Sequence, residues 1–196
     1  MAPPPSTTRS SKRELLIDTA LDLFRSGGYH ATGVEQIVER AGTARMTLYA
    51  HFGSKDELLL AALARLDQRF QDELAERMAM VTEGRARLLT LFDVLEDLVA
   101  SPTFSGCFFV NIANEFTDRQ HPVHRAATAH KLAVATLVAN AATEVGVADG
   151  AALAQQLLVL FDGAIVGARL NGSGDVSAGR RAAEQLVDAA LAAPVA

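Results

Sequence analysis

Residues 44–59, ARMTLYAHFGSKDELL, concentrate side chains that could bind a polyanion. The polar and basic members are Arg45, Thr47, Tyr49, His51 and Lys55. An arginine offers two parallel donors to guanine, a threonine can contact a thymine methyl group or a phosphate, and a tyrosine hydroxyl can reach a phosphate. These residue types at this spacing favour contact with nucleic acid, although a solvated helix face could carry the same side chains.

The charge of the chain is unevenly distributed. The whole sequence has a formal net charge of −5, yet the Lys and Arg residues of positions 1–60 balance the Asp and Glu residues there, so the deficit arises after residue 60. An acidic chain is poor evidence for nucleic-acid binding on global grounds, but the local face decides which partner is attracted. The N-terminal third is therefore where we expect a DNA-binding surface.

Composition restricts the class of protein. With 196 residues, 49% of them hydrophobic, the chain can form a compact soluble fold of at most two domains. Residues 1–10 are rich in Pro, Ser and Thr, which predicts a flexible arm without a secretion signal. No uninterrupted apolar run is long enough to cross a bilayer, and the single Cys107 excludes an internal disulfide, so we expect a cytoplasmic protein that does not enter a membrane.

Three Ser/Thr-x-x-Glu patterns predict helix starts near the N-terminus, at Ser11, Thr32 and Ser54. The first helix should end at Gly27-Gly28 and the second near Ala41-Gly42, because glycine permits the left-handed turn that ends helices. A further short helix should begin near Thr43 and carry Leu48, Tyr49 and Phe52.

Helical spacing continues through the rest of the chain. A long helix is expected from Asp56 to about Met80, and breaks at 82–84, 101–102, 121–122, 146 and 171–174 then predict five more helices. The segment CFFVNIANEF is rich in Phe and Val, but we expect a helix there because Phe108, Ile112 and Phe116 are four residues apart. The predicted fold class is all-α, with about nine helices.

Two short helices joined by a Gly-containing turn and braced by a longer helix form a helix-turn-helix, whose second helix enters the DNA major groove. Leu48 and Phe52 would then face inward. The alternative is simple helix packing, with Tyr49 as a half-buried core aromatic. The DNA contacts predicted for the first interpretation are Thr32, Thr43, Arg45, Met46, Thr47, Tyr49, His51 and Lys55.

Residues 11–60 resemble the N-terminal DNA-binding domain of the TetR family of transcriptional regulators, through LF and GGY in the first helix, Thr32, AGTARMTLYAHF and SKDEL. The resemblance implies a homodimer that binds a palindromic double-stranded DNA operator, usually as a repressor released by a small molecule. Ala44 replaces the usual Ser and Met46 the usual Gly or Ala, so the base preference does not carry over. We expect a helix-turn-helix domain at 11–54 and a helical ligand-binding and dimerisation domain at 55–196.

A candidate pocket for a partly apolar effector lies around the aromatic segment after Ser101. Aromatic and aliphatic side chains would form its walls and a few polar groups would orient the ligand, although an aromatic stripe at helical spacing also suits a core. The predicted ligand-binding residues are Phe92, Leu95, Phe104, Phe108, Phe109, Asn111, Ile112, Glu115, Phe116, His130 and Phe161.

The last two predicted helices have more apolar circumference than one core contact requires, and small residues there allow close approach. Two such helices from each chain could form a four-helix bundle. The predicted dimer residues are Leu153, Leu157, Leu160, Ala164, Gly167, Ala168, Leu186 and Ala190.

Three other interpretations remain open. Glu115, Asp118, His121 and His124 are possible metal ligands by type, but their spacing matches no strong signature, so no metal or cofactor is predicted. A small helical enzyme would require His130, Glu115 and Asp162 to meet in a cavity. A DNA-binding protein that takes no ligand would lack a useful cavity.

Overall fold

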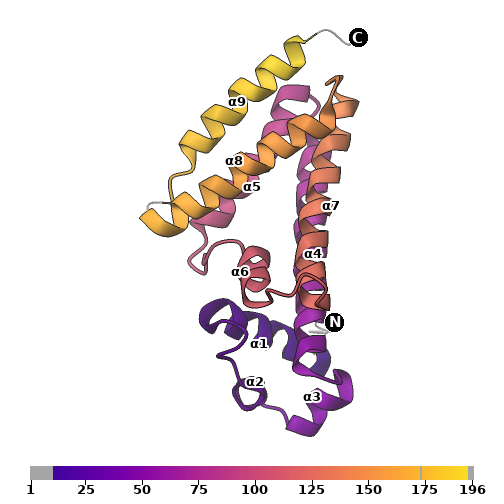
Figure 1. The fold of residues 1–196 in the computed structure, drawn as a ribbon, viewed down its shortest axis with the longest axis vertical. Coiled ribbons are helices and arrows are strands. Elements are labelled where there is room, and N and C mark those ends of the chain that lie inside the picture. Colours follow the sequence, from indigo (N-terminus) through magenta and orange to yellow (C-terminus); the bar gives the residue numbers. More distant parts are fainter. Residues whose placement is uncertain (1–10, 173, 194–196) are drawn as a thin grey trace, which may run out of the picture. The chain divides into compact units, whose positions relative to one another are not determined.

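The computed structural model describes residues 11–172 and 174–193, which form helices and connecting turns without a strand (Figure 1). They divide into two compact units that meet between Ala64 and Arg65. The helices are α1 (Lys12–Gly27), α2 (Val34–Arg40), α3 (Arg45–His51), α4 (Lys55–Met80), α5 (Gly84–Ala100), α6 (Phe108–Glu115), α7 (Pro122–Glu144), α8 (Gly150–Asn171) and α9 (Ser177–Ala192).

This arrangement confirms the predicted all-α class, including the five helices after α4 and the helix in CFFVNIANEF. The predicted arm at 1–10 lies outside the described residues. The predicted domain boundary at 54/55 stays a prediction.

The first unit packs α1 against α2 and α3. Two predicted caps are present, since the hydroxyl of Ser11 accepts from the Glu14 amide at 3.2 Å and that of Ser54 accepts from the Glu57 amide at 3.1 Å. The buried apolar side chains before Arg65 are Leu16, Ile17, Ala20, Leu21, Phe24, Tyr29, Ile37, Ala41, Leu48, Phe52, Leu58, Leu59, Ala62 and Leu63.

The predicted Thr32 cap is wrong. Helix α2 starts after Gly33, whose amide donates to Oε1 of Gln36 at 2.8 Å. The Thr32 side chain is buried, and its hydroxyl donates to the carbonyl of Gly28 at 2.7 Å, at the end of α1. The Thr32 hydroxyl therefore bonds to the end of α1, although the local capping pattern predicts that it caps α2.

The turn between α2 and α3 depends on Gly42, which has φ +59°, a left-handed conformation that glycine adopts without steric cost. The amide of the next residue, Thr43, donates to the carbonyl of Val38 at 2.9 Å and closes the end of α2. Helix α3 then begins at Arg45, slightly later than predicted, after the uncapped Ala44.

In the second unit α8 is the central helix. It packs on α7, α9 and α5, and α6 packs on α7. Helices α8 and α9 run side by side in Figure 1. At its start, α8 approaches α7 so closely that a Cβ on Gly150 would lie 2.6 Å from the carbonyl oxygen of Ala139. The core on this side of Arg65 includes Leu88, Leu91, Phe92, Leu95, Val138, Leu157, Phe161, Ile165, Ala183 and Val187.

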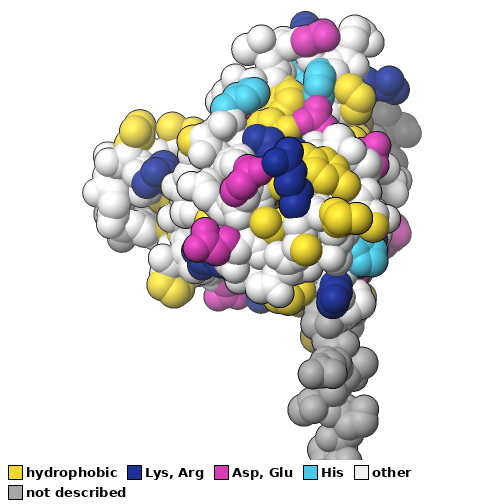
Figure 2. Space-filling view, turned by 90° about the horizontal axis from the view of Figure 1, so that it is seen from below, with side chains coloured by type: hydrophobic (Ala, Val, Ile, Leu, Met, Phe, Trp, Pro, Cys, Tyr) yellow, Lys and Arg dark blue, Asp and Glu magenta, His cyan; other side chains and the backbone are white. Residues whose placement is uncertain are grey.

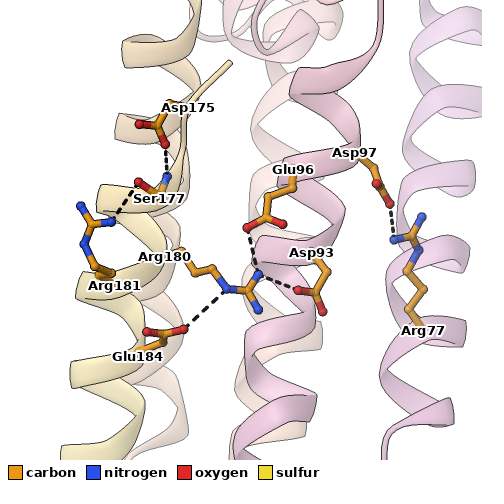
Figure 3. A network of polar contacts seen from close by, with 9 residues as sticks. All are labelled: Arg77, Asp93, Glu96, Asp97, Asp175, Ser177, Arg180, Arg181 and Glu184. Atoms are coloured by element: carbon orange, nitrogen blue, oxygen red, sulfur yellow. Dashed lines mark hydrogen bonds and ion pairs between the residues drawn. The ribbon is translucent and has the colours of Figure 1, made fainter. Parts of the chain in front are cut away.

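Ion pairs connect the outer surfaces of these helices (Figure 3). From α9, Nη1 of Arg180 lies 2.6 Å from Asp93 and 3.1 Å from Glu96, both on α5. Arg77 on α4 contacts Asp97 on α5 at 2.6 Å. Such partly exposed pairs contribute only about 0–1 kcal/mol each, so the apolar core must supply most of the packing free energy.

By length and composition, α8 is the one helix among the described residues that could cross a membrane. The core helix of a soluble bundle passes the same test. In this unit α8 buries Leu153, Leu157, Phe161 and Ile165 against neighbouring helices, and its Asp162 forms an ion pair with Lys131 of α7.

We expect Gly150→Ala to destabilise the protein by about 1–3 kcal/mol, because the added methyl group collides with the backbone of α7. The neighbouring Ala151→Gly is the control and loses only helix propensity, about 1 kcal/mol or less. Urea unfolding followed by circular dichroism measures both. Equal stability of Gly150→Ala and the unmodified protein would contradict the close contact.

Candidate functional site

The surface of α3 presents the side chains that were predicted to meet DNA. Leu48 and the adjoining Phe52 are buried in the first unit, as predicted. Met46 is 85% exposed and Tyr49 40% exposed on the same short helix. Figure 2, seen from below the view of Figure 1, shows Lys and Arg side chains among hydrophobic, acidic and histidine side chains. One apolar face thus fixes α3 while the other face remains accessible.

Arg45 is held in place by two neighbours. Its Nη1 donates to Oε1 of Glu35, on α2, at 2.7 Å. Its guanidinium carbon lies 5.6 Å from the centroid of the Tyr49 ring. The Tyr49 side chain and then the Glu35 carboxylate raise the pKa of Arg45 above its ordinary value, so the guanidinium stays positively charged.

Lys55 contacts the protein itself in this structure. Its ammonium donates to the carbonyls of Tyr29 at 3.0 Å and Thr32 at 2.9 Å, and lies 3.9 Å from the Tyr29 ring centroid. The Tyr29 hydroxyl in turn donates to Asp56. These contacts bind the start of α4 to the segment between α1 and α2. Phosphate contact by Lys55 or Thr32 stays a prediction, and the Thr32 side chain is buried.

The remaining predicted DNA contacts differ in exposure. His51 is exposed, whereas Thr43 and Thr47 are half-buried. The Thr43 hydroxyl is enclosed and makes no hydrogen bond with any described residue. Sequence reasoning missed Glu35 as a partner of Arg45, because the two residues lie on separate helices and only the turn at Gly42 brings them together.

In the second unit, part of the predicted ligand-binding set forms an aromatic cluster. The His130 ring stacks on Phe109 with centroids 3.6 Å apart, and Phe70 packs edge-on against His130 at 5.5 Å. Phe161 contacts both Phe70 and Phe92, with centroid distances of 6.3 and 6.4 Å.

His130 is buried, and its Nδ1 lies 2.7 Å from Oδ1 of Asp67 on α4. Burial lowers the pKa of His130 below its ordinary 6.5, even though the Asp67 carboxylate acts in the opposite direction. His130 is therefore neutral at pH 7, with Nδ1–H donating to Asp67. This arrangement orients the ring as a fixed part of the core.

Two members of the predicted ligand-binding set line pockets of the second unit. Phe104 borders one pocket of about 400 Å³, and Asn111 borders another of about 280 Å³ between α6 and α8. Phe92, Leu95, Phe108, Phe109, Ile112, Phe116 and Phe161 are buried. Glu115 is half-buried. Ligand contact by these residues stays a prediction.

The possible metal ligands near α7 have local partners. His121 caps α7 by accepting from the Val123 amide at 3.3 Å, Asp118 accepts from the Gln120 amide at 2.9 Å, and His124 Nδ1 lies 2.8 Å from the Phe116 carbonyl. Within residues 11–172 and 174–193, no three His, Cys, Asp or Glu side chains form a group that could hold a metal ion.

The predicted dimer residues differ in their exposure within the single chain. Leu153, Leu157 and Ala168 are buried inside their own unit, and their contact with a second chain stays a prediction. Leu160, Ala164, Leu186 and Ala190 are half-buried against the same core. The predicted Gly167 is half-buried as well. The accessible stripe of α8 contains Val159, Gly163, Val166 and Leu170, spaced at helical intervals. Val159 is 72% exposed and Leu170 79% exposed.

Comparisons with known proteins agree with these features. Residues 16–62 match the model "Bacterial regulatory proteins, tetR family", and residues 84–186 match "Tetracyclin repressor-like, C-terminal domain". The transcriptional activator FasR of Mycolicibacterium smegmatis is 34% identical over 91 residues, which cover 46% of this chain and 42% of FasR. The regulator YjdC of Escherichia coli is 27% identical and covers 90% of this chain and 93% of its own.

Among solved structures, SCO4454 of Streptomyces coelicolor, a TetR-family transcriptional regulator, superposes with a TM-score of 0.81 at 31% identity. The match covers 92% of this chain and 94% of SCO4454. These relatives are regulators and not enzymes. With family models matching both its helix-turn-helix segment and most of its second unit, the chain belongs to the TetR family of bacterial transcriptional regulators.

Proposed function

We propose that this regulator is a cytoplasmic repressor that binds a palindromic operator as a homodimer and is released by a small molecule. The DNA-binding proposal rests on the accessible face of α3. Arg45, Met46 and Tyr49 are exposed on this helix, while buried Leu48 fixes it to the first unit. Arginine can read guanine with two donors, and an exposed methionine offers an apolar surface to a thymine methyl group.

The outward stripe of α8 supports the dimer. Val159, Val166 and Leu170 are large, apolar and exposed. Apart from its chain neighbours and the backbone of its own helix, no described residue has an atom within 4 Å of a Cβ placed on Gly163. A second copy that presents the same stripe would cover these side chains across a two-fold axis. Two copies of α3 could then read half-sites about 34 Å apart on one side of the DNA.

Ligand control requires a site on the second unit, and the pockets beside α8 support one there. An effector that favours one dimer arrangement would change operator affinity without touching DNA, since the coupling depends on differential affinity for two states. Repression is proposed from the family's repressor-like C-terminal model.

Fluorescence anisotropy of the purified protein with DNA selected from a random library tests the DNA-binding proposal. The protein is then titrated with the selected duplex and a scrambled duplex at two salt concentrations. We expect selective binding that weakens with salt, because phosphate contacts release counterions. Failure to select any sequence, with equal weak binding to both duplexes, would contradict operator recognition.

Arg45→Ala should weaken operator binding by about 1–3 kcal/mol, the usual contribution of a bidentate arginine–guanine contact. Glu35→Gln should instead strengthen it, because Glu35 competes with DNA for the Arg45 guanidinium. The same anisotropy titration measures both variants.

Glu39→Gln is the matched control, since it removes the same charge from the same helix without an ion pair to Arg45. It should strengthen binding less than Glu35→Gln does. If Glu35→Gln has the same effect in the Arg45→Ala background as in the unmodified protein, the two residues are not coupled and the competition is excluded.

Val159→Glu should convert the dimer to a monomer and abolish tight operator binding, because a carboxylate on each copy would be buried at the two-fold interface. Leu132→Glu, which places the same charge on an exposed position of α7, should leave the dimer intact. Sedimentation equilibrium measures both, and circular dichroism checks folding. A Val159→Glu dimer as stable as the Leu132→Glu dimer would exclude this interface.

A further inference from the structure

The pocket between α6 and α8 combines an apolar wall with charged groups. It has a volume of about 280 Å³, near the lower limit of small-molecule sites. Val110 of α6 and Ile165, Val166 and Leu170 of α8 provide apolar surface. Three of these side chains, Val110, Val166 and Leu170, are exposed in the single chain, so the pocket opens onto the surface that the proposed dimer would cover.

The charges that line this pocket do not cancel. Asp162 is neutralised by the ammonium of Lys131, which forms an ion pair with it. Arg169 is exposed and has no ion pair or hydrogen bond with any residue that the structure describes. The guanidinium of Arg169 is therefore the uncompensated charge of the pocket, and it would attract an anion.

Two neighbouring residues, Asn111 and Gly106, shape the pocket next to Arg169. The Asn111 amide donates to the carbonyl of Ser105 at 3.2 Å, which orients this side chain at the pocket edge. Gly106 has φ +93°, and a Cβ there would lie 3.8 Å from Cγ of Arg169 and 3.8 Å from Nδ2 of Asn111. The larger pocket of about 400 Å³ also includes Arg169, together with Val99 and Phe104. The guanidinium thus borders apolar space on two sides.

We propose that this pocket binds a compact amphipathic carboxylate, with the carboxylate paired to Arg169 and the apolar part against Val110, Ile165 and Leu170. A guanidinium and a carboxylate can form two parallel hydrogen bonds, which fixes the ligand's orientation. This inference rests on the proposed function in one respect, that the bound carboxylate is the effector.

The position of the pocket beside the outward stripe of α8 connects ligand binding to regulation. Val166 and Leu170 belong to both the pocket and the outward stripe of α8. A ligand packed on these side chains changes the surface offered to a second copy. By thermodynamic linkage, a carboxylate that weakens operator binding must itself bind less tightly to the operator complex.

The test uses the full chain and straight-chain carboxylates from hexanoate to decanoate, with the matching primary alcohols as uncharged probes. Isothermal titration calorimetry without DNA compares the unmodified protein with Arg169→Gln and with Arg125→Gln, a control that removes an exposed arginine from α7. Loss of a charge-assisted pair should weaken carboxylate binding about 10- to 100-fold in Arg169→Gln, with little change in Arg125→Gln.

Equal affinity for acid and alcohol, equal affinity of Arg169→Gln and the unmodified protein, or no carboxylate binding at millimolar concentration would each overturn the proposal. Operator anisotropy with and without the best carboxylate separates this inference from the proposed function. Binding without operator release refutes the effector role alone. A protein that binds carboxylate at Arg169 but selects no DNA refutes the proposed operator recognition and leaves the pocket in place.

Discussion

Burial of one face of α8 is the interaction on which the second unit depends. Leu157, Phe161 and Ile165 fill the space between α5, α7 and α9, and the close contact at Gly150 sets the distance to α7. Burying a side chain of this size contributes about 1.5–3 kcal/mol, more than the exposed ion pairs around it. The other faces of α8 do not pack in this core. They form the outward stripe and one wall of the pocket beside Arg169.

In the first unit, the short helix α3 likewise has one buried face and one accessible face. Burial of Leu48 fixes α3, so its accessible side chains keep a defined spacing without contributing to the core. The contacts of Lys55 with two backbone carbonyls add a polar attachment next to this helix. A basic residue in a DNA-binding motif can therefore have a structural task as well as, or instead of, a contact with phosphate.

Helix number and most helix ends could be predicted from the sequence, because Gly28, Gly42 and Pro122 interrupt helical spacing locally. Tertiary contacts decide the rest. Thr32 fits a capping pattern, yet its hydroxyl turns to the end of α1, and Gly33 becomes the cap. On α8 both faces are apolar, so periodicity could not say that Leu153 faces inward while Val159 faces outward.

The sequence indicated the candidate DNA-binding surface more directly than the pocket, because tertiary contacts assemble the pocket. Its residues are nearly contiguous in one helix, whereas Arg169 meets Asn111 and Gly106 only after α6 folds onto its neighbours. Aromatic composition indicated ligand contacts, but the aromatic rings around His130 are mostly packed against one another. Composition shows that apolar side chains are present but not where a cavity remains between them.

The ion pair between Arg45 and Glu35 has a kinetic consequence. With balanced charge over the first sixty residues and the guanidinium already paired, this segment exerts little long-range attraction on distant phosphates. Encounter with DNA should then proceed near the unsteered rate of about 10⁵–10⁶ M⁻¹s⁻¹. Under the proposed function, sequence discrimination then depends on the lifetime of the complex, in which Arg45 exchanges its exposed pair with Glu35 for a base edge.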